Sequence, residues 1–220
     1  MSTQIHNVNR ALLRCGVSKF VVAMTEDTEE AAAALELYDS TLRETLRAFP
    51  WPFATKYAKG NATVGASMQL IDGSAAAPAN ADWIFAWRYP TDGVFVRRVV
   101  GAEGRKYARN PPPFRVGRNS PLAVGDPTED VMVVYTNVDL PLIEYTALVD
   151  LVLPTTDPLF EDVFQINLAA KFAMLLSRDA DLARKLYLLF KDALPVSTRA
   201  AAAEQQQEAP GEAEWISARD

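Results

Sequence analysis

The sequence predicts an α+β protein in which a helical bundle carries an inserted antiparallel β domain and ends in an extended C-terminal arm. Apolar residues recur every three or four positions in residues 1–50 and 154–208, which is the period of amphipathic helices. In residues 51–153 this period gives way to alternation, with frequent proline and glycine, which favours strands and turns. Residues 209–220 combine proline, glycine and one aromatic residue, so we expect the arm there.

Two helices are expected in the N-terminal region. The first ends at Gly16, and the second begins at Asp27 with a capping box completed by Glu30 and ends before Pro50. The apolar stripe of the first helix comprises Ile5, Val8, Leu12 and Cys15. The stripe of the second comprises Ala31, Leu35, Tyr38, Leu42, Leu46 and Phe49. We expect both stripes to be buried.

The middle region predicts at least four strands. In the first of them, four aromatic residues share one face by alternation: Trp83, Phe85, Trp87 and Tyr89. Residues 94–100, 131–136 and 142–149 are rich in β-branched and aromatic residues and predict three more. Residues 60–82 are rich in alanine, glycine, serine and asparagine, which predicts a long loop or a loose hairpin.

Two more helices are expected after the strands. Asp157 followed by Pro158 is typical of a cap and first helical turn. The stripe of this helix comprises Phe160, Phe164, Leu168, Phe172 and Leu175. Residues 177–179 end it and cap the next helix, whose stripe comprises Leu182, Leu186, Leu189 and Phe190. Pro195 is expected to kink or end the last helix, with residues 198–208 helical again.

The composition argues against most kinds of catalytic site. The only histidine is His6, in the first turns of the chain, and a Ser/His/Asp triad or a histidine zinc site would need it. The only cysteine, Cys15, excludes an internal disulfide. No phosphate-cradling or calcium loop is present, and no run reaches the roughly 20 apolar residues of a membrane span. We therefore expect a protein without a membrane segment that is not an enzyme and that needs no metal or cofactor.

Acidic residues near the second helix raise one enzymatic alternative, a carboxylate hydrolase that acts on the cell wall. They are Glu26, Asp27, Glu29 and Glu30. Their place at a helix start, where negative charge is favourable, explains them without catalysis.

Charge is divided unevenly along the chain. The net charge is −6, yet residues 83–118 carry eight basic and two acidic residues, and residues 119–163 carry nine acidic and no basic ones. The basic residues after Val96 are Arg97, Arg98, Arg105, Lys106, Arg109, Arg115 and Arg118, interleaved with aromatic residues. This pattern indicates either nucleic-acid contact or pairing with the acidic segment of another copy or domain. The adjoining acidic segment favours pairing between copies or domains.

The C-terminal arm offers one anchor. Trp215 and Ile216 are either ordinary residues of a chain end or side chains that dock into a partner's groove.

The order of several motifs resembles the tail tubular protein A family, the head-to-tail adaptors or connectors of short-tailed bacteriophages. These motifs lie at residues 9–14, 49–55, 83–99, 114–116, 144–146, 157–170 and 215–219, in the family's order. Each motif is weak alone, but together they cover nearly the whole chain. The sequence departs from the family pattern in the long, alanine-rich 60–82 segment and in Pro195 within the last helix.

The resemblance implies a virion protein of the phage neck, assembled in the host cytoplasm. It implies a homo-oligomeric ring of twelve copies between the portal protein and the tail nozzle, a protein similar to tail tubular protein B. Genomic DNA passes through such a ring without sequence-specific binding, and the ring serves genome retention, tail assembly and DNA ejection.

The resemblance also implies site residues. Trp215, Ile216 and Arg219 in the arm are expected to dock on the portal. Arg97, Arg98, Arg105, Lys106 and Arg109 are expected at contacts between copies or with the portal, while part of the acidic 119–163 segment faces the DNA channel or the next copy. Acidic walls suit a channel because each lysine or arginine contact to phosphate would slow the DNA.

Overall fold

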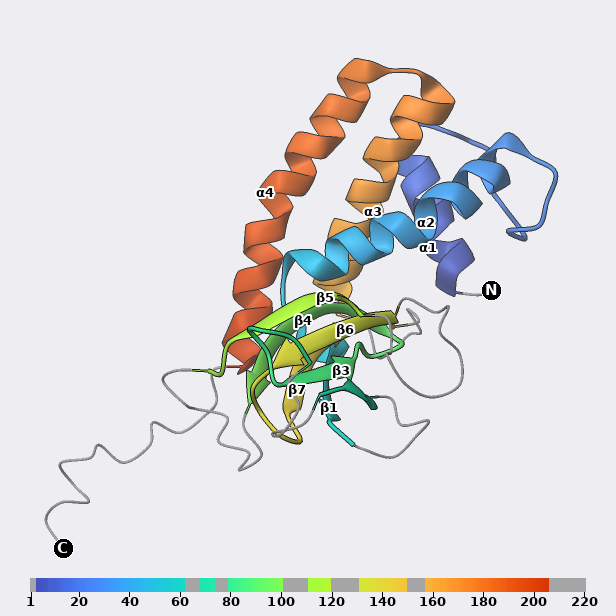
Figure 1. Ribbon diagram of the computed structural model, residues 1–220. Helices are drawn as coiled ribbons and strands as arrows, with labels where there is room; N and C mark the ends of the chain where they lie inside the picture. The colour runs from blue at the N-terminus through green and yellow to red at the C-terminus, as the bar shows by residue number, and fades with distance from the viewer. Residues whose placement is uncertain are drawn as a thin grey trace, which may run out of the picture. The chain divides into compact units, whose positions relative to one another are not determined.

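The fold is α+β, as the sequence predicts. A computed structural model describes residues 3–61, 68–73, 79–100, 111–119, 131–149 and 157–205, and these contain four α-helices and two antiparallel sheets (Figure 1). The chain divides into two compact units. The helical unit comprises Met1–Thr45, Trp51–Phe53 and Leu151–Asp220, and the β unit comprises Leu46–Pro50 and Ala54–Asp150. The predicted arm at residues 209–220 lies outside the described residues.

The N-terminal helices are α1 (Thr3–Arg14) and α2 (Glu29–Ala48). Gly16 follows α1 with a φ of 79°, a left-handed conformation that glycine adopts without strain. The predicted cap of α2 at Asp27 is wrong by one residue. The hydroxyl of Thr28 accepts a hydrogen bond from the Ala31 amide at 3.2 Å, so Thr28 fills the capping position.

The stripes of α1 and α2 are confirmed in most positions. Val8 and Leu12 of α1 and Cys15 directly after it are buried, as are four of the residues predicted on α2: Ala31, Tyr38, Leu42 and Leu46. Leu35 was predicted to be buried and is instead 68% exposed. Ala34, one position earlier, is fully buried. The buried face of this helix therefore includes Ala34 and not Leu35.

The C-terminal helices are α3 (Pro158–Phe172) and α4 (Ala180–Gln205), joined through a π-helical segment, Ala173–Ser177. The predicted cap at Asp157 is confirmed, because its carboxylate accepts a hydrogen bond from the Leu159 amide at 2.8 Å. The predicted break is confirmed as well. Arg178 is left-handed with a φ of 50°, and the Asp179 carboxylate caps α4 by accepting from the Leu182 amide.

Pro195 does not end α4, so of the two predicted effects, a kink or an end, the structure excludes the end. It lies inside a helix of 26 residues that runs without a break. A proline removes one backbone N–H, which leaves the carbonyl four residues earlier without its helical partner. Pro195 and Lys191 are both exposed, so water can solvate that carbonyl and the helix tolerates the ring.

Aromatic side chains form much of the interior of the helical unit. In Figure 1, α3 and α4 run antiparallel and side by side. The Phe160 ring makes edge contacts with Trp51 and Phe53, each at 4.9 Å between centroids, and the Phe164 ring meets Tyr38 at 5.2 Å. These contacts join α2, α3 and the 3₁₀ turn Pro52–Ala54 around one core.

Buried polar groups in the same unit pair with one another. The side-chain amide of Gln165 donates to the side-chain oxygen Oδ1 of Asn7 at 2.7 Å. The side-chain amide of Asn167 donates to the Thr45 hydroxyl at 3.3 Å. Arg14 of α1 and Asp162 of α3 form an ion pair at the surface. Hydrogen bonds between buried side chains are stabilising, so these bonds favour the observed pairing of helix faces.

The β unit holds a three-stranded and a four-stranded antiparallel sheet. The first has the strand order β1-β7-β4 and the second the order β2-β3-β6-β5. Their bounds are β1 Thr55–Lys59, β2 Leu70–Asp72, β3 Phe85–Arg88, β4 Gly93–Val100, β5 Phe114–Asn119, β6 Val131–Thr136 and β7 Leu142–Ala147. The predicted strands at 94–100, 131–136 and 142–149 are thereby confirmed, with small changes of bounds.

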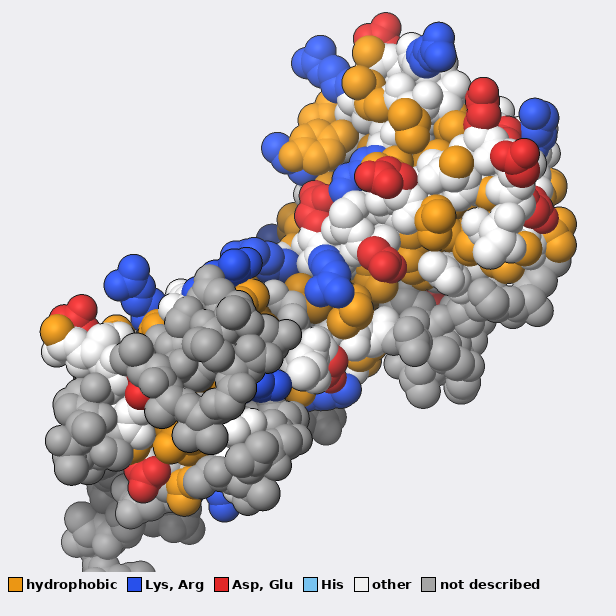
Figure 2. Space-filling view, turned by 45° about the vertical axis from the view of Figure 1, so that its right-hand side comes forward, with side chains coloured by type: hydrophobic (Ala, Val, Ile, Leu, Met, Phe, Trp, Pro, Cys, Tyr) orange, Lys and Arg blue, Asp and Glu red, His pale blue; other side chains and the backbone are white. Residues whose placement is uncertain are grey.

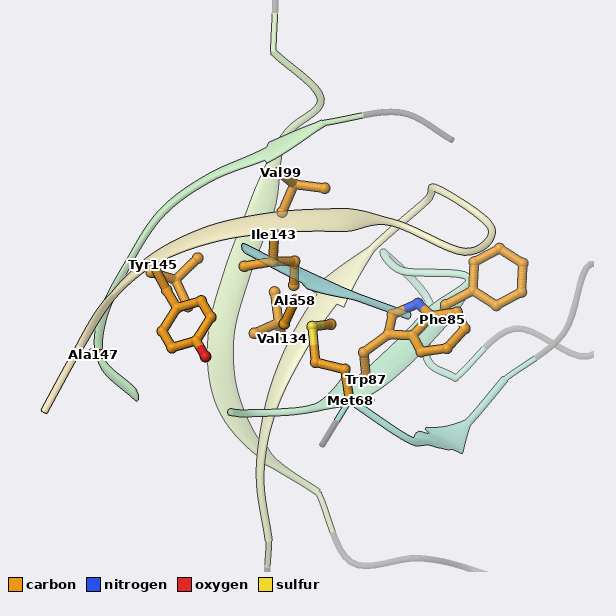
Figure 3. Packing of buried hydrophobic residues seen from close by; sticks show 10 residues of the cluster. Ala58, Met68, Phe85, Trp87, Val99, Val134, Ile143, Tyr145 and Ala147 are labelled. Atoms are coloured by element: carbon orange, nitrogen blue, oxygen red, sulfur yellow. The ribbon is translucent and has the colours of Figure 1, made fainter. Parts of the chain in front are cut away.

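One core lies between the two sheets. Ile143 of β7 and Val134 of β6 belong to different sheets, and Figure 3 shows both pointing into the same interior beside Ala58 and Met68. The strand predicted at 83–89 is shorter than expected, since Trp83 and Tyr89 flank β3. The 60–82 segment, predicted as a long loop or a loose hairpin, contains β2, which pairs with β3 beyond that segment. The predicted strands do not include β1, a short strand in which Lys56, Tyr57 and Lys59 are exposed and Ala58 is buried.

Candidate functional site

The structure describes two of the eight predicted site residues. Arg97 and Arg98 lie on β4. Arg105, Lys106 and Arg109 fall outside the described residues, and so do Trp215, Ile216 and Arg219. Only the first pair can therefore be placed against its surroundings.

The Arg97 side chain binds the C-terminal end of α2. The helix residues from Leu46 onward belong to the β unit, as Arg97 does. The Nη2 of Arg97 donates to the carbonyl oxygens of Leu46 and Arg47, at 3.2 and 3.1 Å. Its Nε donates to the Thr146 hydroxyl at 2.9 Å, and its guanidinium lies 4.6 Å from the centroid of the Phe95 ring. The last carbonyls of a helix have no helical donors and carry partial negative charge, so a cation is favourable there. Burial lowers the pKa of Arg97, but the group stays charged.

The Arg98 side chain is paired across the sheet. Its Nε donates to a carboxylate oxygen of Glu144 at 2.7 Å, and the two residues are register partners on β4 and β7. Burial opposes the charge of Arg98, but the hydrogen bond and charge of Glu144 outweigh it, so the pKa of Arg98 is raised. The basic and acidic segments of the sequence therefore meet here within one chain.

A second polar group lies on the same sheet, around Asp92. Its carboxylate accepts from Lys56 Nζ at 2.7 Å and from the Tyr145 hydroxyl at 3.0 Å. Burial alone would raise the pKa of Asp92, but these two hydrogen bonds lower it below its usual value. Burial and then the hydrogen bond to Asp92 raise the pKa of Tyr145 to about 12. The group ties β1, β7 and the turn before β4 together.

These contacts give Arg97 and Arg98 a structural role inside the β unit. That role does not test whether they also contact another copy or the portal, which stays a prediction. It does change how the prediction can be tested. Reversing their charge would disturb the β unit, so a loss of assembly in such a variant would have two causes.

Two further exposed basic residues of the β unit lie on β5. Arg115 and Arg118 are exposed and line a hollow of about 400 Å³ together with Trp83 and Tyr135. Two arginines beside two aromatic rings can hold a polyanion or an acidic peptide.

The helical unit carries a groove that the sequence did not predict. It has a volume of about 650 Å³ and is lined mainly by apolar residues of α2, α3, the π-helical segment and α4: Leu37, Glu44, Asn167, Ala170, Lys171, Met174, Leu175, Ala180, Ala183, Arg184 and Tyr187. Met174 is 58% exposed, Leu175 52% and Tyr187 45%. In Figure 2, hydrophobic side chains gather among charged ones at the top, where Figure 1 places the turn between α3 and α4.

Two stripe residues of the C-terminal helices, Leu175 and Leu189, are about half exposed. Of the two, Leu175 lines the groove. Leu175 follows the start of the π-helical segment, which adds a residue to the turn and moves the later side chains off the α-helical stripe. The C-terminal helices contain more apolar residues than a single buried stripe holds, and this excess is the sequence signal for the groove. The periodicity of one sequence does not show which of these residues remain exposed.

Neither metal ligands nor a membrane span is found in the described residues. Histidine, cysteine and acidic residues form no group of three or more there that could hold a metal ion. None of the described helices is both long and apolar enough to cross a bilayer.

No protein-family model matches the chain, and no curated protein matches its sequence.

Proposed function

We propose that this chain is a head-to-tail adaptor of a short-tailed bacteriophage. In this proposal it forms a ring, of twelve copies, between the portal protein and the tail nozzle. The ring retains the packaged genome, receives the tail and conducts DNA at ejection. The protein acts through its contacts and not as an enzyme.

The observation that carries the proposal is the discontinuous helical unit. Segments before and after the β unit fold together into one bundle. The aromatic side chains of Tyr38 in α2 and Phe164 in α3, for example, make an edge contact. A helical bundle with an inserted β domain is the architecture that the resemblance to the tail tubular protein A family implies. The exposed apolar groove also supports a protein that works through protein contacts, because monomeric proteins seldom leave such surfaces uncovered.

The test is binding to portal rings. We expect the full chain to sediment with purified portal rings and a chain lacking residues 209–220 to remain in the supernatant. The double variant Trp215→Ala, Ile216→Ala should lose most of the binding, since aromatic anchors dominate small interfaces. The matched control is Gln206→Ala, Gln207→Ala, which shortens two side chains just before the arm and should bind normally. Portal binding by the chain without the arm would overturn the portal-docking assignment.

A second candidate function is nucleic-acid binding, favoured by the hollow on β5. If that hollow holds phosphates, Arg115→Glu with Arg118→Glu should abolish a steeply salt-dependent affinity for bare DNA. The adaptor proposal expects weak DNA affinity that the pair of substitutions changes little.

A further inference from the structure

The groove of the helical unit is built to receive an apolar side chain. Tyr187, Met174 and Leu175 stand about half exposed around it, while Ala170 and Ala183 line it as small buried residues. Large side chains around small ones leave a depression between α3 and α4. A depression of about 650 Å³ has room for an indole ring and its neighbours.

The charges around the groove favour an acidic occupant. Lys171 bonds to Glu44 at 2.6 Å, so these two lining charges neutralise each other. Arg184 is the third charged residue of the lining, and in the part of the chain that the structure describes no carboxylate lies within ion-pair distance of it. The lining therefore carries one net positive charge.

The segment that follows α4 has the matching chemistry. Residues 206–220 contain four acidic residues and one arginine, and Trp215 stands between Glu214 and Ile216. A large aromatic residue in a polar segment is an effective anchor in a groove. Glu214, next to Trp215, supplies the negative charge that Arg184 can pair with.

The segment is also long enough to reach the groove of its own chain. From Gln205 at the end of α4 back to Tyr187 is about 27 Å of helix at roughly 1.5 Å per residue. The ten residues 206–215 span up to about 33 Å when extended. A chain that turns back along α4 thus brings Trp215 to the groove.

We propose that the C-terminal segment 206–220 docks in the groove of its own chain, with Trp215 between α3 and α4 and Glu214 at Arg184. The free protein thereby covers this apolar groove. The inference stands on the groove and the segment, and it does not require the adaptor function. If both hold, binding of Trp215 to the portal and to the groove exclude each other in one copy.

Disulfide trapping in the full chain tests the docking. Ser217→Cys is combined with Ala180→Cys in a Cys15→Ser background and oxidised with glutathione disulfide. Ala180 lies in the groove lining, and its replacement keeps every large side chain there. The control pair is Ser217→Cys with Val196→Cys, because Val196 is 62% exposed, lies about 160° round the helix from Ala180 and is nearer to the segment.

We expect the Ala180 pair to close within one chain about tenfold faster than the Val196 pair, since docking raises the local concentration of residue 217 at the groove. Trp215→Ala should abolish the advantage of the Ala180 pair. An Ala180 pair that closes no faster than the nearer Val196 pair would show an undocked segment and overturn the proposal. Crosslinks between chains would show that the segment of a second copy fills the groove, which also overturns it.

A charge reversal tests the role of Arg184. We expect Arg184→Glu to reduce the preference for Ala180 about fivefold. Lys185→Glu makes the same charge change on the next residue, outside the groove lining, and should leave the preference unchanged. Equal effects of the two reversals would contradict the contact with Arg184. Hydrogen exchange of residues 170–187 gives an independent readout without cysteines, and protection there should fall in Trp215→Ala.

Discussion

The helical unit and the β unit use their side chains in opposite ways. In the helical unit, several apolar residues that the sequence assigns to the interior lie at the surface, among them Leu35 and Leu175. In the β unit, basic residues that the sequence assigns to an outer contact surface hold the fold together, since Arg97 and Arg98 have partners inside the unit. In this protein the exposed apolar residues of the helical unit are therefore better candidates for a partner surface than Arg97 and Arg98.

The largest expected effect comes from the aromatic core of the helical unit. Phe164→Ala should lower the free energy of unfolding by about 4 kcal/mol, because Phe164 is fully buried against Phe160 and Tyr38. Leu175→Ala, an exposed member of the same predicted stripe, should change it by less than about 0.5 kcal/mol. Urea denaturation followed by helical circular dichroism measures both. Similar losses in the two variants would break the distinction between core and surplus residues.

The next effect concerns Arg97. Arg97→Ala should destabilise the β unit by about 2 kcal/mol, because the carbonyls of Leu46 and Arg47 and the Thr146 hydroxyl all lose their donor. Arg115→Ala removes the same side chain from an exposed position on β5 and should cost less than about 0.5 kcal/mol. Thermal unfolding of both variants compares them. An Arg97→Ala variant with unchanged thermal stability would contradict the structural role and favour the contact with another copy or the portal that the sequence predicts.

Tyr145 makes the stability of the β unit sensitive to alkali. Its pKa rises from 10.0 to about 12 on folding, so the neutral hydroxyl is favoured in the folded state. This contribution is fully present below pH 10 and is lost as the pH rises from about 10 to 12, by about 1.5 kcal/mol. Tyr145→Phe should remove that part of the pH dependence. Denaturation at pH 9 and pH 11.5 measures it, and parallel pH curves for the two proteins would contradict the assignment.

The smallest effect distinguishes two neighbouring residues at the start of α2. Thr28→Ala should cost about 1 kcal/mol, because the Ala31 amide loses the hydroxyl that caps it. Asp27→Ala should cost only a few tenths of a kcal/mol, through the helix dipole. The same urea titration measures both variants, and the reverse order would restore the cap that the sequence predicts.

Much of the fold could be predicted because it follows local rules. The caps and stops at Gly16, Asp157 and Asp179 depend on a few neighbouring residues, and the structure confirms them. For Pro195 the sequence could not decide between a kink and an end, because the outcome depends on exposure, which the local sequence does not show.

The sites were harder to predict because they depend on long-range pairing. Arg98 meets Glu144 through strand register, and Arg97 reaches the end of α2 about fifty residues earlier in the chain. The groove combines side chains of α2, α3 and α4 that are close only after folding. Charge counting along the chain could not reveal either arrangement.

The central claim, a head-to-tail adaptor, is tested most directly by particle mass with and without portal rings. For the free protein we predict the mass of one chain, 24.2 kDa. With cognate portal rings we predict that the complex gains a full ring of copies, twelve chains per portal. A free protein that forms rings in the absence of portal, or a portal mass that does not change, would contradict the account.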